Sequence, residues 1–220
     1  SSGGSPSTAR KTSKTRGSSE AAEIMDKLDM ERALGAEGYP FVAGVDEVGR
    51  GPLAGPVVAA AVILPLDADF TGVNDSKKLS AKKREALAAY IKEHALSYSI
   101  FEVDEKTIDR INIREATRLA MKGAVEGLFV QPSLVLSDGD LTLDVALPQK
   151  SIVKGDALVC SIGAASILAK VYRDALMAEY AKLYPEYAFE RNAGYGTAAH
   201  VSAIREVGIC PIHRRTFVTK

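Results

Sequence analysis

Short runs of apolar residues along the chain predict strands. Residues 41–48 and 56–64 are two such runs, and the glycine-rich residues 49–55 between them form the predicted turn. Residues 96–103 also have strand-like character, and residues 134–136 are a shorter apolar run. These runs indicate a sheet in the core of the protein.

Helical spacing describes most of the remaining apolar positions. A short helix is predicted near residues 20–36, and a second helix begins after Ser80, a typical N-cap residue, and continues to about His94. A third is predicted from about Asn112 to Leu128. The last helix, from Ala164 to about Tyr184, has one apolar face. Off that face lie the polar residues Ser166, Lys170, Arg173 and Asp174. Strands and helices in this order predict an α/β fold with a mixed central sheet flanked by helices.

The first 20 residues differ in composition from the rest. They consist mainly of Ser, Gly, Thr, Lys and Arg, and Glu20 is the first acid, so this tail is predicted to be disordered. An expression remnant, a basic tether and an organellar transit segment all fit this composition. With 46% hydrophobic residues in 220, residues 21–220 are expected to form one domain around one core.

Charge and cysteine content narrow the class of protein. The chain carries 28 basic and 28 acidic residues, so its net charge gives no general attraction to nucleic acid and any polyanion must be met by local patches. Cys160 and Cys210 lie far apart and outside any CxxC motif, which is typical of reduced thiols. No apolar run reaches the roughly 18–20 residues that span a bilayer. A soluble, cytoplasmic protein is therefore predicted.

Four acids stand at or near the ends of apolar runs. Asp46 and Glu47 interrupt the run 41–48, Asp138 comes just after the run 134–136, and Asp156 follows the apolar residues near 152. Acids at the ends of several strands can converge, and three or four carboxylates from different elements are what two-metal phosphoryl hydrolysis requires. Oxygen ligands alone favour Mg²⁺ or Mn²⁺ over zinc.

Local pattern leaves alternatives for each of these acids. In a regular strand Asp46 and Glu47 point to opposite faces, so both could bind a metal only if the strand ends or bulges there. They could instead form salt bridges with lysines. Asp138 and Asp156 beside glycines are also typical turn residues. Asp140 and Asp144 are close enough to compete with Asp138, although only Asp138 comes just after the apolar run.

Six ordered motifs resemble bacterial ribonuclease HII, the type 2 ribonucleases H. They are GVDEVGRGPLAGP at 44–56, NDSKKLS at 74–80, VKGD at 153–156, AASILAK at 164–170, GYGT at 194–197 and CPIHRR at 210–215. The resemblance extends over roughly residues 35–217. It implies a ribonuclease H-like fold with a helical C-terminal extension. It also implies cleavage of the RNA strand of RNA/DNA hybrids and incision 5′ of single ribonucleotides embedded in duplex DNA.

The resemblance also assigns roles to individual residues. The four metal-binding carboxylates would be Asp46, Glu47, Asp138 and Asp156. The Gly-Arg-Gly turn, here Gly49, Arg50 and Gly51, would read the ribose 2′-hydroxyl, which alone separates RNA from DNA at a given sugar. Tyr195 would stack on the deoxyribose that follows the ribonucleotide. The remaining candidates for contact with substrate phosphates are Lys77, Lys78, Ser166, Lys170 and Arg173. The protein is expected to be a monomer. A sliding clamp or another repair protein is a candidate binding partner.

One position departs from the family pattern. Where the family commonly has a lysine before the Gly-Tyr pair, this chain has Ala193. The missing cation could weaken the positioning of a phosphate without touching the acids. A hybrid-binding protein of the same fold with weakened turnover is therefore the alternative function.

Two further classes of protein match parts of the sequence. Residues 49–54 formally match a dinucleotide-binding fingerprint, with Asp67 or Asp69 about 20 residues further on. Such a turn must open a helix, whereas residues 56–64 predict a strand, and adjacent acids would repel a pyrophosphate. A related nuclease of DNA junctions or of long hybrids is disfavoured by the Gly-Arg-Gly turn and by Tyr195.

Overall fold

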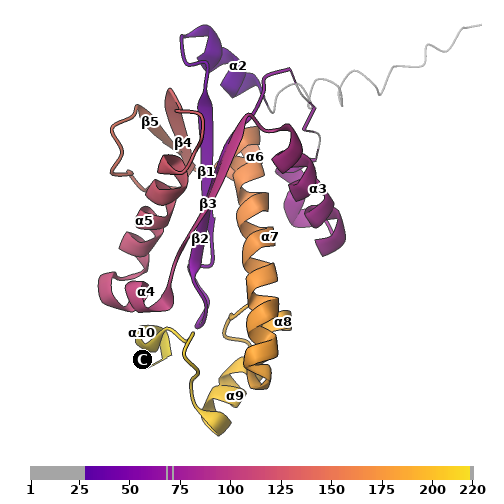
Figure 1. Cartoon of the computed structure of the whole chain (residues 1–220), viewed down its shortest axis with the longest axis vertical. Helices are drawn as coiled ribbons and strands as arrows, with labels where there is room; N and C mark the ends of the chain where they lie inside the picture. The colour runs from indigo at the N-terminus through magenta and orange to yellow at the C-terminus, as the bar shows by residue number, and fades with distance from the viewer. Residues whose placement is uncertain (1–27, 68, 71, 219–220) are drawn as a thin grey trace, which may run out of the picture.

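The computed structural model describes residues 28–67, 69–70 and 72–218. The predicted tail, residues 1 to about 20, lies outside this part of the chain. Five strands form one mixed sheet in the order β3-β2-β1-β4-β5 (Figure 1). Their bounds are β1 Val42–Val48, β2 Val57–Ile63, β3 Ser97–Val103, β4 Leu134–Asp138 and β5 Gln149–Ile152. Strand β2 pairs antiparallel with β1 and β3, whereas β4 pairs parallel with β1 and β5, so the predicted mixed sheet is confirmed.

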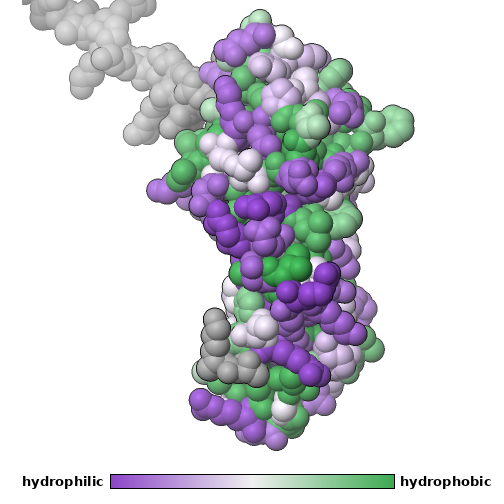
Figure 2. Space-filling model, turned by 90° about the vertical axis from the view of Figure 1, so that its left-hand side faces the viewer, coloured by the Kyte–Doolittle hydropathy of each residue, from purple (hydrophilic) through white to green (hydrophobic). Residues whose placement is uncertain are grey.

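Helices cover both faces of this sheet. Helices α3 (Ala81–His94) and α7 (Cys160–Leu183) lie on one face, and α5 (Ile113–Glu126) lies on the other (Figure 1). Alternate residues of β2 divide between the two sides: Val58, Ala60 and Val62 pack toward α7 and α3. Val57, Ala59 and Ala61 pack toward α5. Burial of both faces explains why this strand is an unbroken apolar run. The outer surface of the α5 side mixes polar and apolar residues, with hydrophilic ones gathered around the middle of the molecule (Figure 2).

The start of α7 is fixed against strand β1. A Cβ built on Gly44 would overlap the backbone of Ser161 and Ile162, so only glycine permits this approach. Glu31, in helix α2 (Asp29–Ala36), accepts hydrogen bonds of 2.9 Å from both the backbone N–H and the hydroxyl of Ser161. A carboxylate at the first turn of a helix satisfies backbone N–H groups that have no partner within the helix. Two independent contacts thus hold α7 beside the strand that carries Asp46.

The C-terminal part of the chain forms a helical extension beyond the end of the sheet (Figure 1). It comprises η2 (Pro185–Tyr187), α8 (Phe189–Asn192), α9 (Ala198–Val207) and α10 (Arg215–Val218). The first three of these elements pack around a separate apolar cluster that includes Ala54, Met177, Tyr187 and Phe189, whereas Phe217 of α10 packs against the core on the α5 side of the sheet. The predicted C-terminal extension is confirmed.

Several element bounds differ from the sequence-based predictions. The 3-10 helix η1 (Val73–Lys78) and helix α4 (Glu105–Ile111) were not predicted, and α7 begins at Cys160 rather than near Ala164. The predicted helix at 20–36 falls partly outside the described residues. Ser80 caps α3 as predicted, accepting a hydrogen bond from Lys83 N. Cys160 is buried and Cys210 is half-buried. No helix in the described ranges is long and apolar enough to cross a membrane.

Candidate active site

Three acids from different elements meet at one point. Parallel pairing of β1 with β4 sets Val45 opposite Ser137, so Asp46 and Asp138 follow side by side. Asp156 joins them, and its backbone N–H donates to Oδ2 of Asp138 at 3.0 Å. One carboxylate oxygen from each of these three acids lies within 4.8 Å of the other two. The structure therefore brings together three of the four predicted acids.

Asp156 reaches this point from a helix rather than from a strand end. Strand β5 ends at Ile152, Lys154 adopts a left-handed conformation with φ of 55°, and Asp156 lies in the first turn of α6 (Gly155–Leu158). The sequence-based interpretation of an apolar strand that ends in this acid is corrected in that respect. The left-handed turn is what redirects the chain toward Asp138.

Glu47 lines the same cleft but stands outside the group of three. Its Oε1 lies 3.7 Å from Nη1 of Arg50, and its backbone N–H donates to Oδ1 of Asp46 at 2.8 Å. Pairing of β1 with β2 continues without a bulge to Val48. The expected strand end or bulge is therefore absent at Asp46 and Glu47, and both still reach one cleft because β4 ends beside them.

Burial and mutual repulsion disfavour the negatively charged forms of Asp46 and Asp138. Asp46 is 7% exposed, and its burial, together with the neighbouring Glu47 and Asp138, raises its pKa well above the ordinary value. Burial also raises the pKa of Asp138. At Asp156 burial acts in the same direction, but hydrogen bonds from Lys77 and with Asp138 outweigh it and lower the pKa.

A cation already approaches the cluster from one side. Nζ of Lys77 lies 2.9 Å from Oδ2 of Asp156, and that hydrogen bond raises the pKa of Lys77. The side chain of Lys77 is 84% exposed, and its ammonium meets the cluster at Asp156. Because the donors are all carboxylate oxygens and their charge is only partly compensated, the residues present fit a hard divalent cation.

The acids stand in a cleft of about 450 Å³. Its lining includes the predicted residues Lys77, Ser166 and Lys170, and also Arg84 and Lys154, which the sequence analysis did not single out. A lysine two residues before Asp156 was the available signal for Lys154. Lys78 is exposed and lies outside the lining.

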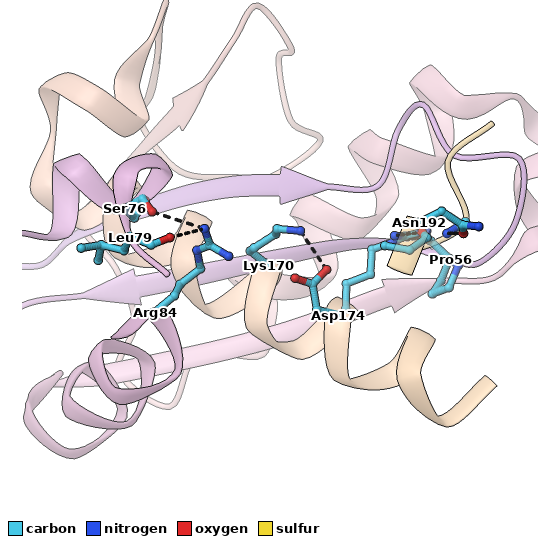
Figure 3. A network of polar contacts seen from close by, with 10 residues as sticks. Pro56, Ser76, Leu79, Arg84, Lys170, Asp174 and Asn192 are labelled. Carbon is cyan, nitrogen blue, oxygen red and sulfur yellow. Dashed lines mark hydrogen bonds and ion pairs between the residues drawn. The ribbon is translucent and has the colours of Figure 1, made fainter. Parts of the chain in front are cut away.

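Two of the cleft cations are held by local contacts. Arg84 donates to the carbonyls of Ser76 and Leu79, which fixes the loop carrying Lys77, and Lys170 pairs with Asp174 at 2.8 Å (Figure 3). The latter contact is the helix ion pair that the spacing of four residues predicts. Asp140 and Asp144, the competitors of Asp138, are 75% and 89% exposed and pair with Arg114 and Lys122 respectively.

Arg173 does not lie where the sequence analysis expected it. Its side chain is 1% exposed and donates to three backbone carbonyls, those of Ala54, Pro56 and Ala193. A guanidinium buried in this way has no surface to present to a phosphate. The predicted phosphate contact is therefore corrected to a structural role beneath the Gly-Arg-Gly turn.

Glycines 49 and 51 serve different purposes in that turn. Gly49 has φ of +90°, and a Cβ there would collide with Nε of Arg173, so this glycine makes room for the buried arginine. A Cβ on Gly51 would meet only Cε1 of Tyr195, at 3.5 Å. Gly51 and the half-exposed ring of Tyr195 thus lie side by side, although they are far apart in sequence.

A pair of buried histidines supports the loop of Tyr195. Nδ1 of His200 lies 2.8 Å from the carbonyl oxygen of Tyr195, and Nε2 of His200 lies 2.9 Å from Nε2 of His213. Nδ1 of His213 accepts from the backbone N–H of Cys210. Since a carbonyl only accepts, His200 carries its proton on Nδ1, and His213 carries its proton on Nε2. The chain of hydrogen bonds is complete with both rings neutral.

The fold and the acid cluster define the class of protein. A mixed five-stranded sheet whose central strands bring acids together, with a helical extension, is the architecture of a ribonuclease H-like nuclease of type 2. Ribonuclease H2 from Pyrococcus horikoshii shares this fold with a TM-score of 0.70 and 28% identity, over 80% of this chain and 93% of that one. The ribonuclease HII of the PCNA complex from Archaeoglobus fulgidus shares the fold with a TM-score of 0.68 and 24% identity, over 81% of this chain and 94% of that one.

The particular family follows from the sequence comparison. The model of the ribonuclease HII family matches residues 43–220, and the chain belongs to this family. Ribonuclease HII of Chlorobium chlorochromatii is 58% identical over 185 residues, which cover 81% of this chain and 90% of that protein. The chain is thus a ribonuclease H endonuclease acting on RNA/DNA hybrids. Residues 57–63 form strand β2, so the glycine turn opens no helix and the dinucleotide interpretation fails.

The histidine pair makes stability depend on pH. Burial lowers the pKa of His213 to about 4, against a value near 6.5 in the unfolded chain. Between these values only the unfolded chain binds the proton, so stability that is present above pH 6.5 is lost as the pH falls toward 4. When the pH is lowered from 7 to 5, the free energy of unfolding of the parent should fall by about 2 kcal/mol more than that of His213→Gln. Urea unfolding at the two pH values measures this difference.

The matched control for this measurement is His94→Gln, which changes an exposed histidine. That variant should lose stability with falling pH as the parent does. The same acid sensitivity in the parent and in His213→Gln would contradict the assignment of a buried neutral ring.

Proposed function

We propose that this ribonuclease H incises duplex DNA on the 5′ side of a single embedded ribonucleotide, in addition to cleaving the RNA strand of hybrids. The observation that carries the proposal is the position of Gly51 against Tyr195, in a turn whose Arg50 approaches the acids at Glu47. Arg50 links the two regions, because its guanidinium lies 3.7 Å from Glu47 in the cleft. A ribose read by the turn would therefore lie close to the carboxylates, with the tyrosine ring beside the next sugar.

The proposed cofactor is Mg²⁺ or Mn²⁺, held by Asp46, Glu47, Asp138 and Asp156. When bound, such ions supply a water nucleophile and stabilise the leaving oxygen. Asp46, which is buried, and Asp138, which is half-buried, supply oxygens at fixed positions, because both stand on paired strands. Glu47 is the most adjustable of the four acids, since it stands outside the group of three that share one point.

Cations around the cleft suit the substrate backbone. Lys77, Lys154 and Lys170 line the cleft together with Ser166, and Lys78 is exposed beyond it. Lysine ammonium groups and a serine hydroxyl are typical phosphate contacts, which position a duplex without reading its sequence. In-line attack would leave a 3′-hydroxyl and a 5′-phosphate. Lys77 would exchange its contact with Asp156 for a substrate phosphate when a metal ion binds.

A second candidate function is hybrid binding with weakened turnover. Ala193 favours it, since the family commonly has a lysine there. Ala193 also adopts a left-handed conformation with φ of 49°, and its carbonyl accepts from Arg173 at 2.6 Å. The backbone at this position is thus held by Arg173 and needs no lysine for its placement. A monomer and a sliding-clamp partner stay predictions, the latter supported by the Archaeoglobus protein solved with PCNA.

The test is incision of a DNA duplex that contains one ribonucleotide, with Mn²⁺, Mg²⁺ or EDTA. We expect metal-dependent cleavage 5′ of the ribonucleotide and none of an all-DNA duplex. Recovery only in Ala193→Lys would indicate an intact metal site with poor substrate positioning. Absence of cleavage in both proteins, with binding retained, would favour the binding function and overturn the proposal.

Asp46→Asn tests the acid cluster. Loss of one negative ligand disrupts metal binding more than the groove, so cleavage should fall about a hundredfold or more while duplex affinity changes little. Single-turnover cleavage and fluorescence anisotropy measure the two effects. Asp140→Asn is the matched control, because Asp140 is 75% exposed and outside the cluster, and it should cleave normally. Normal cleavage by Asp46→Asn would refute the assignment.

Arg50→Ala tests the recognition turn. Because the side chain is 41% exposed and bridges toward Glu47, its loss should raise KM or relax discrimination between ribose and deoxyribose, by about tenfold. Cleavage of matched duplexes with ribose or deoxyribose at one position measures this ratio. Arg114→Ala, which removes an exposed arginine of α5, should leave the ratio unchanged. If Arg50→Ala discriminates between ribose and deoxyribose as well as the parent does, the proposed role of Arg50 in ribose recognition is wrong.

A further inference from the structure

Three segments far apart in sequence meet beneath the recognition surface. They are the turn at 49–56, the loop at 192–196 and the C-terminal segment 210–214. The proposed function assigns roles to the turn and the loop but none to the C-terminal segment. The turn and the loop touch directly, since the N–H of Leu53 donates to the carbonyl of Gly194 at 2.8 Å. The C-terminal segment contacts both of them.

Arg214 binds the turn from inside the protein. Its side chain is 0% exposed, and its three guanidinium nitrogens donate to the carbonyls of Gly49, Arg50 and Gly55. Its backbone N–H donates to the carbonyl of Leu53 at 2.8 Å. These four contacts span the whole turn, so Arg214 determines the path of the backbone that would read the ribose.

His213 binds the loop on the other side. The residue forms an antiparallel bridge with Ala54, so its backbone follows the turn. Its ring connects through His200 to the carbonyl of Tyr195, as described above. Adjacent residues of one strand-like segment thus hold the two halves of the recognition surface, with Arg214 on the turn and His213 on the tyrosine loop.

The chemistry of these contacts makes them specific. A planar guanidinium can serve three carbonyls at once, whereas a lysine ammonium offers a single compact centre. Buried carbonyls that lose their donors carry a desolvation cost, so the turn would rearrange rather than keep its shape. At position 213 only a side chain that donates at the site of Nε2 can keep the link to His200.

We propose that His213 and Arg214 are positioning residues that set the distance between the Gly49–Gly51 turn and Tyr195, and thereby the preference for a ribonucleotide followed by DNA over a long hybrid. The inference rests on the proposed function, in which the turn reads the ribose and Tyr195 contacts the next sugar. A long hybrid needs only the turn, whereas the junction needs the turn and the ring at a fixed spacing.

The first test compares two substitutions at one position. The amide nitrogen of Gln can replace Nε2 of His213 as the donor to His200, whereas the shorter Asn can replace only Nδ1. We expect His213→Asn to lose about tenfold in the kcat/KM ratio of junction to long hybrid, and His213→Gln to keep the parent ratio. Equal ratios in the two variants, whether both retained or both lost, would overturn the proposal.

The second test uses Arg214→Lys, with Arg191→Lys as the matched control because Arg191 is 86% exposed. Arg214→Lys should raise KM for both substrates about tenfold or more, with a smaller change in kcat, while Mn²⁺ affinity by calorimetry stays at the parent value. An unchanged KM in a folded Arg214→Lys protein would contradict the proposal, and so would the same change in Arg191→Lys.

The two levels of inference fail differently. If the parent does not incise a single ribonucleotide, the proposed function is wrong. If the parent incises it but the junction preference is unaffected in His213→Asn and KM is unaffected in Arg214→Lys, only the positioning role is wrong. Melting temperatures of all variants identify any protein that has lost its fold. If the variants of one test do not fold, the other test decides whether the positioning role is correct.

Discussion

The close approach of helix α7 to strand β1 at Gly44 is the constraint on which the rest of the structure depends. No Cβ fits between the strand and the backbone of Ser161, so the long helix starts in direct contact with the strand that carries Asp46. From there α7 runs along the sheet and supplies Ser166 and Lys170 to the cleft, then Arg173 to the turn. A shift of α7 at Gly44 would displace all three.

Charged side chains gather in two places, at the cleft and beneath the glycine-rich turn. Three acids gather beside the end of strand β4, with Asp46 buried and the other two half-buried, and Lys77 pairs with one of them, an arrangement that suits a site that binds metal. Two arginines a short distance away are buried without a carboxylate in hydrogen-bond contact, and backbone carbonyls receive their donors instead. The charges of the first group line the cleft, whereas those of the second group hold the backbone of the turn.

Much of the fold and of the acid cluster could be predicted from the sequence because both depend on local patterns. Apolar runs marked four of the strands, and the position of Asp138 just after such a run distinguished it from Asp140. The role of Arg173 could not be predicted. Its charge placed it off the apolar face of the helix, and its carbonyl partners in the turn lie 117 and 119 residues away. The link from His213 to Tyr195 likewise passes through a third residue that sequence spacing does not reveal.

The contacts of Arg214 also have a meaning for the order of events during synthesis. The carbonyls of the Gly49–Gly55 turn accept hydrogen bonds from Arg214, which lies 159 to 165 residues further along the chain. Contacts of such long range form late, after the cost of closing the intervening loop has been met. A nascent chain that already contains every acid of the cluster therefore still lacks the shaped turn. The backbone of the turn is therefore fully held only once Arg214 has joined it.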